Sequence, residues 1–161
     1  MTDFRSVLSV LAESGIEFIV VGGVAAAAHG SPRATFDLDV VYRRTPQNLA
    51  RLVAALGPLH PSLRGAPPGL PFNFDVQTLK AGLNFTLSTD FGPLVLIGDI
   101  AGGGDYDALL PHSTLHAVHG ASCRIVDLDT LIHLKRAAGR PKDFEAIAEL
   151  ELLRDATDRQ Q

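Results

Sequence analysis

The chain has 161 residues, of which 46% are hydrophobic and 20% are charged, with a formal net charge of −4 at pH 7. This length predicts one domain with a sizeable core. The negative net charge argues against broad non-specific binding to nucleic acid, so any such binding would need a local basic patch. A single cysteine, Cys123, excludes an internal disulfide and fits a reducing cytoplasm, and no apolar run approaches the roughly 20 residues that a membrane span needs.

The predicted elements begin with a helix over 3–14 and a buried strand over 18–21. The helix has a capping aspartate at its start and apolar residues at helical spacing, and the strand is a β-branched and aromatic run. Gly22 and Gly23 break the strand, and residues 24–28 have the composition of a packed helix. A strand that passes through two glycines into a helix leaves free backbone N–H groups where a phosphate can approach closely. This turn is therefore a candidate phosphate-binding site.

A second predicted strand carries Asp37 and Asp39. Residues two apart in a strand project from the same face, about 6.6 Å apart by the strand rise. Two carboxylates presented in this way opposite a phosphate-binding turn can hold Mg²⁺ on a triphosphate. Either feature alone has a simpler explanation, a tight turn for Gly-Gly and a solvated strand edge for Asp-Leu-Asp. Their combination, with thirteen residues between Gly23 and Asp37, matches a signature of a hydrophobic strand, Gly-Gly, a short helix and two aspartates alternating with hydrophobic residues.

The middle of the chain is predicted to contain one helix, a long loop and a β-hairpin. Thr45 can cap a helix whose leucines recur at helical spacing, and the stretch 57–69, rich in proline and glycine, is predicted to be a loop. The stretch 72–100 has a β pattern, with an alternating run over 84–89, a turn, and a buried run over 94–97. We expect this hairpin to extend the sheet of the first two strands.

The C-terminal part is predicted to be mainly helical. A short helix ends near residue 110, and two further helices are expected over 127–138 and from residue 141 to about 154. A β-like run over 122–126 lies between the short helix and the helix over 127–138.

The hydrophobic strand, the Gly-Gly turn, the short helix and the alternating pair of aspartates together resemble the nucleotidyltransferase superfamily, the fold of DNA polymerase beta and of tRNA nucleotidyltransferases. The likeness is greatest to its small stand-alone bacterial branch, which includes the abortive-infection toxin type, because 29–39 resembles that branch's linker and 127–143 its C-terminal helix. The resemblance implies an α+β fold of layered type, with a short mixed β-sheet flanked by helices and a C-terminal helical pair. It also implies a single domain over 1–161, with a core over about 1–104 and a helical part over about 105–161.

The same resemblance implies an activity and a set of site residues. The reaction would be the Mg²⁺- or Mn²⁺-dependent transfer of a nucleoside monophosphate from an NTP to a hydroxyl group of RNA or protein, with release of pyrophosphate. Asp37 and Asp39 would be the catalytic residues and would hold the metal. The substrate-binding residues would be Gly22, Gly23, Arg33, Thr35, Lys135, Arg140 and Lys142. For Lys135 a solvated helix end is an equally good interpretation.

The resemblance also implies a second metal ion on the acceptor side, shared by Asp37 and Asp39 and completed by a third carboxylate that can serve as base. That third carboxylate is the expected part that the sequence does not supply. In similar proteins the returning strand of the hairpin carries it, within a run like Leu-Asp-Leu-Leu-Gly-Glu. Here the corresponding run is 94–99, and Val95 stands where the acid is expected. Asp99 shares the strand face of Val95 but lies about 13 Å further along, so only a bend at Gly98 would make it a metal ligand, and a capping role is the simpler interpretation.

Three functional interpretations follow from this pattern. The first is an active nucleotidyltransferase of toxin-like type. The second is a catalytically degenerate relative that binds a nucleotide or a partner protein without transfer, and the third is a structural half of a toxin–antitoxin pair with an antitoxin-like partner. The presence of Gly22, Gly23, Asp37 and Asp39 favours the first, whereas Val95 favours the second.

Overall fold

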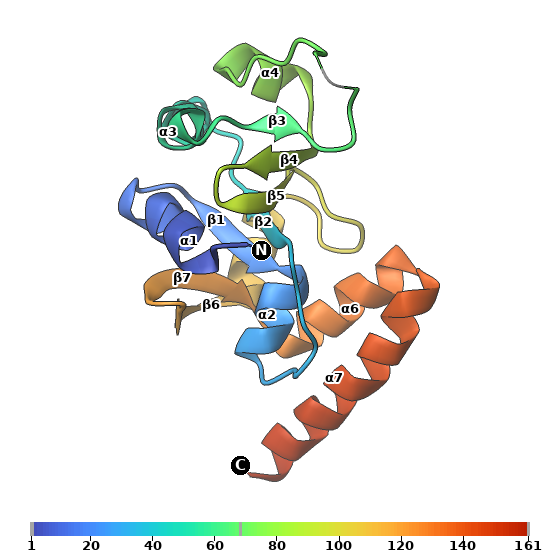
Figure 1. Cartoon of the computed structure of the whole chain (residues 1–161). Coiled ribbons are helices and arrows are strands. Elements are labelled where there is room, and N and C mark those ends of the chain that lie inside the picture. The colour runs from blue at the N-terminus through green and yellow to red at the C-terminus, as the bar shows by residue number, and fades with distance from the viewer. Residues whose placement is uncertain (1, 68, 161) are drawn as a thin grey trace.

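The computed structural model describes residues 2–67 and 69–160, and across them seven strands form one sheet in the order β3-β4-β5-β2-β1-β7-β6 (Figure 1). The strands are β1 (Phe18–Val21), β2 (Leu38–Tyr42), β3 (Ser62–Leu63), β4 (Phe85–Thr89), β5 (Gly92–Ile97), β6 (Ser113–Val118) and β7 (Ala121–Val126). The helices are α1 (Phe4–Glu13), α2 (Gly22–Ala28), α3 (Pro46–Leu56), α4 (Val76–Ala81), α5 (Tyr106–Leu109), α6 (Leu128–Ala138) and α7 (Pro141–Arg159), with 3₁₀ turns η1 (Gly57–Leu59) and η2 (Leu110–His112).

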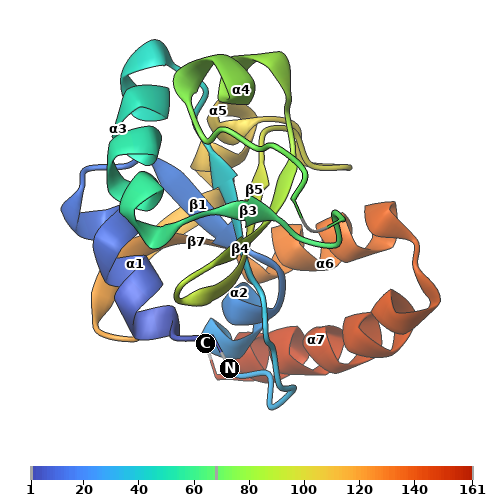
Figure 2. The same ribbon diagram turned by 45° about the horizontal axis from the view of Figure 1, so that its top comes forward.

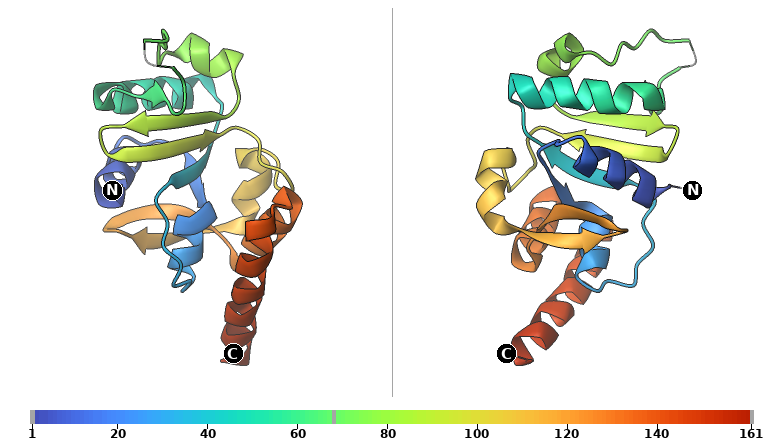
Figure 3. Two further views of the ribbon diagram at one scale, coloured as in Figure 1. Left: turned by 45° about the vertical axis from the view of Figure 1, so that its right-hand side comes forward. Right: turned by 90° about the vertical axis from the view of Figure 1, so that its left-hand side faces the viewer.

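The sheet is mixed, which confirms the predicted α+β fold class. The central strand β1 is antiparallel to β2 and parallel to β7, and β2 is parallel to β5. Helices α1 and α3 lie on one face of the sheet and α6 lies on the other (Figure 3). All four residues of β1 are buried, as expected for a strand with neighbours on both sides and helices above and below.

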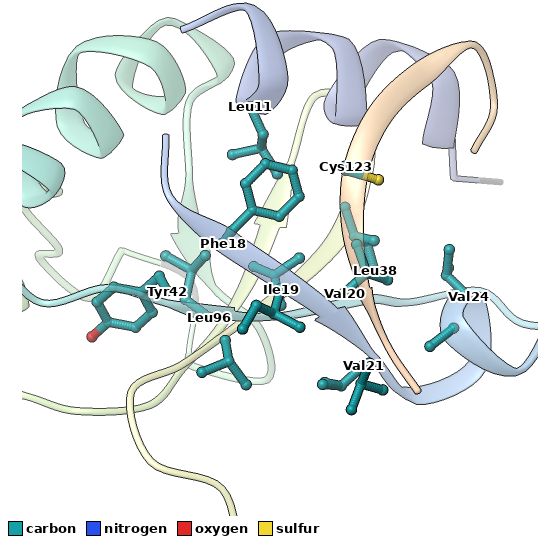
Figure 4. Packing of buried hydrophobic residues seen from close by; sticks show 14 of the residues in the cluster. Leu11, Phe18, Ile19, Val20, Val21, Val24, Leu38, Tyr42, Leu96 and Cys123 are labelled. Carbon is teal, nitrogen blue, oxygen red and sulfur yellow. The ribbon is translucent and has the colours of Figure 1, made fainter. Parts of the chain in front are cut away.

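The core forms around β1. Its side chains pack with Leu11 of α1, Val24 of α2 and Leu96 of β5 (Figure 4). Cys123 of β7 belongs to the same cluster, and its burial raises the pKa of the thiol to about 11. Within the part of the chain that the structure describes, no helix is both long enough and apolar enough to cross a membrane.

The structure differs from the sequence-based prediction in three segments. The expected loop over 57–69 contains η1 and strand β3, and the expected β stretch over 72–100 contains helix α4. Only Leu79 of α4 is buried, so this short helix has no periodic apolar pattern that the sequence could reveal. The part of the chain beyond residue 105 was expected to be helical, but it contains the hairpin β6–β7. Both strands belong to the main sheet, so the sheet extends across the expected boundary near residue 104.

The pairing of strands decides which residues meet at the centre of the sheet. Because β1 and β2 are antiparallel, Val21 at the end of β1 lies beside Asp39 near the start of β2. Asp39 in turn lies beside Val95 of the parallel neighbour β5. Helices α6 and α7 lie side by side next to α2 (Figure 2), which brings the last quarter of the chain to the same place.

Candidate active site

The turn between β1 and α2 needs glycine for close packing. Gly22 has φ +67°, and a Cβ atom there would lie 2.3 Å from Oδ2 of Asp39. A Cβ atom on Gly23 would lie 2.4 Å from Oγ1 of Thr35. The absence of side chains therefore lets the Asp39 carboxylate and the Thr35 hydroxyl pack directly against the turn.

Substitution of Gly22 by alanine is expected to lower the free energy of unfolding by about 2 kcal/mol, because a left-handed backbone costs a residue with a Cβ atom about 1–2 kcal/mol and the methyl group must displace Asp39. The variant should also lose affinity for Mg²⁺–NTP, measured by calorimetry beside urea denaturation. Gly15→Ala is the matched control, since Gly15 has φ +69° but no atom within 4 Å of its Cβ position. An equal loss of NTP affinity in both variants would show that the turn acts only through stability.

The two aspartates have different environments. Asp37 precedes β2 and forms a double contact with Arg64, with Nη1–Oδ1 at 3.0 Å and Nη2–Oδ2 at 3.4 Å. The Asp39 carboxylate is half-buried and accepts no hydrogen bond from the described residues. Burial, together with the negative charge of Asp37, raises the pKa of Asp39 to about 6. A cation between the two carboxylates would relieve this repulsion.

A buried carboxylate organises the basic residues opposite. Asp143, 2% exposed, accepts hydrogen bonds from Nε of Arg140 at 2.8 Å and from its backbone N–H at 3.2 Å, and lies 3.8 Å from Nζ of Lys135. Burial alone would raise the pKa of Asp143, but the hydrogen bonds and charge of Arg140 and the charge of Lys135 hold it below its usual value. Burial also lowers the pKa of Lys135. The local basis of this arrangement is the three-residue spacing of Arg140 and Asp143 at the start of α7, which lets the carboxylate accept from both the backbone and the side chain of Arg140.

Arg33 connects the segment before β2 to α7 through ion pairs. Its Nε donates to Oε2 of Glu149 at 2.6 Å, and its Nη2 lies 3.6 Å from Glu145. Thr35 donates from its hydroxyl group to the carbonyl oxygen of Asp37 at 3.3 Å. Both residues therefore have a structural role in holding this segment, in addition to any contact with a substrate.

Two hollows meet at the aspartates. The first, which we call the α7-side hollow, has a volume of about 350 Å³ and is lined by all seven predicted substrate-binding residues, Gly22, Gly23, Arg33, Thr35, Lys135, Arg140 and Lys142. The second, the sheet-side hollow, has a volume of about 460 Å³ and has Arg64, Thr86 and Val95 on its wall. Asp37 and Asp39 line both hollows.

The tentative metal ligand Asp99 does not line either hollow. It is exposed beyond the end of β5, where its backbone N–H approaches Oδ1 of Asn84 at 3.5 Å. Among the described residues no group of three or more His, Cys, Asp or Glu side chains is placed to hold a metal ion. Mg²⁺ in phosphate-transfer sites is usually bound through one or two carboxylates and the phosphates of the substrate. Asp37 and Asp39 fit one such ion, whereas a second ion held by a third carboxylate does not fit.

Arg64, like Asp143, is a site residue that the sequence did not predict. It lies in the stretch predicted to be a loop, 27 residues from its partner Asp37. No sequence pattern links the two, because their contact depends on the pairing of β3 with β4 at the edge of the sheet.

Comparison with known proteins supports the fold. No protein-family model matches the sequence, and no curated protein is significantly similar to it. A similar solved structure is that of a putative nucleotidyltransferase (TM1012) from Thermotoga maritima, with a TM-score of 0.54 and 14% sequence identity. The similarity covers 99% of this chain and 96% of the other. Over nearly its whole length, this chain therefore shares the fold of that protein.

Proposed function

We propose that this protein is a metal-dependent nucleotidyltransferase that transfers a nucleoside monophosphate from an NTP to a hydroxyl group of RNA or protein. One observation carries the proposal. One hollow is lined by Gly22 and Gly23, by Asp37 and Asp39, and by the basic residues of α6, of α7 and of the connection between these helices, although about a hundred residues separate the two regions in the sequence.

The α7-side hollow suits a triphosphate. Lys135, Arg140 and Lys142 supply positive charge to phosphate oxygens, and the glycine turn leaves room for them. Mg²⁺ or Mn²⁺ bound with Asp37 and Asp39 would supply positive charge to the triphosphate in the transition state. The acceptor would enter from the sheet-side hollow, since both hollows share the aspartates.

The transfer step is a displacement at the α-phosphorus. The acceptor oxygen forms a bond to this phosphorus, and the bond to the oxygen that bridges the α- and β-phosphates breaks. Pyrophosphate leaves with that electron pair, and the hydroxyl proton passes to water. The protein's contribution is to align the two oxygens and to neutralise charge.

A second candidate function is favoured by a specific observation. Val95 stands beside Asp39 where a third carboxylate is expected, and Asp37 is already paired with Arg64. A protein that binds a nucleotide or a partner protein without catalysing transfer needs neither a third carboxylate nor an unpaired Asp37. The toxin-like role and the antitoxin-like partner remain expectations from the sequence resemblance.

The test is an incubation with each α-³²P-labelled NTP, with Mg²⁺ or Mn²⁺ and a total RNA or protein lysate. We expect label from one NTP to appear in RNA or protein with the wild type and not with Asp37→Asn/Asp39→Asn. Binding of Mg²⁺–NTP by calorimetry without any labelling would support the degenerate alternative. If the wild type neither labels an acceptor nor binds any NTP, both nucleotide-based functions are wrong.

A further inference from the structure

Arg64 belongs to a row of residues that crosses the sheet to the aspartates. Its backbone N–H donates to the carbonyl oxygen of Thr86 at 3.0 Å, which continues the pairing of β3 with β4. Thr86 pairs with Val95 across β4 and β5, and Val95 pairs with Asp39 across β5 and β2. Paired residues on neighbouring strands project from the same face. Arg64, Thr86, Val95 and Asp39 accordingly line the same sheet-side hollow.

The guanidinium of Arg64 lies over this row and contacts both oxygens of the Asp37 carboxylate. Its side chain is 36% exposed and that of Asp37 is 41% exposed, so the contact lies at the open side of the hollow. The strand wall beside it is apolar at Val95 and carries the neutral hydroxyl of Thr86, whereas Lys135, Arg140 and Lys142 line the hollow from the side of α6 and α7. A permanent positive charge thus lies beside the aspartates at the position where this sheet offers no acid to hold a second divalent ion.

We propose that Arg64 takes the place of the acceptor-side metal ion, so that the site works with one divalent ion bound through Asp37 and Asp39. This inference rests on the proposed function. In the transfer step written above, Arg64 would donate N–H hydrogen bonds to the attacking acceptor oxygen or to an α-phosphate oxygen. An arginine stays protonated at every relevant pH, so it orients and neutralises but does not remove the proton, which passes to water.

The first measurement counts ions and needs no variant. Wild-type protein is titrated with Mn²⁺ in the presence of an α,β-methylene NTP analogue, and bound ions are counted by electron paramagnetic resonance. We expect one bound ion per chain. Two bound ions in the wild type would overturn the inference while leaving the proposed function intact.

The second measurement tests the role of the guanidinium. Arg64→Met should lower the labelling rate about 100-fold, as the loss of one donor that acts in the transition state does, with little change in affinity for the Mn²⁺–analogue complex. Arg51→Met is the matched control, because Arg51 is exposed on α3 and, within residues 2–67 and 69–160, its side chain hydrogen-bonds only to the carbonyl oxygen of Gly15. Circular dichroism melts should show all variants folded.

A gain-of-metal variant completes the test. Val95→Asp combined with Arg64→Met restores the expected third carboxylate and removes the competing cation, so the count of bound Mn²⁺ should rise from one to two and part of the lost rate should return. Faster labelling or tighter Mn²⁺ binding in Arg64→Met alone would mean that Arg64 blocks the site, and the inference would be wrong. If wild-type protein binds no Mn²⁺–analogue at all, the proposed function fails together with this inference.

Discussion

Asp37→Asn/Asp39→Asn is expected to reduce Mg²⁺-dependent NTP binding and transfer by about 1,000-fold or more, while the protein still unfolds cooperatively. The double substitution removes both carboxylates that line the two hollows, and a bound divalent ion contributes several kcal/mol to the transition state. Calorimetry with each NTP in the presence and absence of Mg²⁺ measures the loss. Unchanged Mg²⁺-dependent affinity in the double variant would show that the metal site lies elsewhere.

The single variant Asp39→Asn should stabilise the metal-free protein above pH 6. Burial, with the charge of Asp37, raises the pKa of Asp39 from 3.8 to about 6 in the folded state, so the folded protein becomes less stable as the pH rises from about 4 to 6. Asparagine removes this loss, which amounts to at most about 3 kcal/mol for a shift of this size. Urea denaturation at pH 8 should show the gain, and at pH 4 the two proteins should be nearly equal.

Asp99→Asn is the control for both measurements. Asp99 is exposed and does not line either hollow, so its substitution should change neither NTP affinity nor transfer. If Asp99→Asn abolishes activity, Asp99 is a metal ligand after all, and the turn after β5 must rearrange when the substrate binds.

Asp143→Ala is expected to lower the free energy of unfolding by about 3 kcal/mol and to weaken triphosphate binding. The substitution removes the buried partner of Arg140 and Lys135 and the carboxylate that accepts the backbone N–H of Arg140 at the start of α7. Breaking a buried ion pair on one side leaves a poorly solvated charge, here the half-buried Lys135. Both cations line the α7-side hollow, and without Asp143 they are no longer held in position. We therefore expect NTP affinity to fall about tenfold, which corresponds to the loss of one well-placed charge-assisted hydrogen bond.

The effect of Asp143 should depend on pH in a defined direction. Its pKa is lowered in the folded state, so its contribution is full above its ordinary value of 3.8 and is lost as the pH falls below that value. The difference between wild type and Asp143→Ala should therefore shrink below pH 4. Asp158→Ala, an exposed position on the same helix, should leave both stability and NTP affinity unchanged. A stability loss without any change in NTP affinity would limit Asp143 to a purely structural role.

Much of the local structure around the site could be predicted from the sequence. The capped starts of α1, α3 and α6 and the short run of β1 depend on neighbouring residues, and the structure confirms them. The two glycines and the alternating aspartates are also local patterns, but Gly22 and Gly23 form the first residues of α2, and Asp37 precedes β2 instead of lying in the predicted strand. Helix α4 and the hairpin β6–β7 were not predicted as such, because their burial patterns are too short or too irregular to show a period.

The sequence by itself thus determined the fold class, the turn, the two aspartates and the basic residues that share a hollow with them. Only the tertiary structure decided that Asp37 is paired with Arg64, that Asp143 orients Arg140 and Lys135, and that Asp99 stays outside the site. The physical reason is the range of the interactions. Capping and periodicity act within a few residues, whereas the pairing of Arg64 with Asp37 follows from the register of β3, β4, β5 and β2 across the sheet, which no single segment specifies.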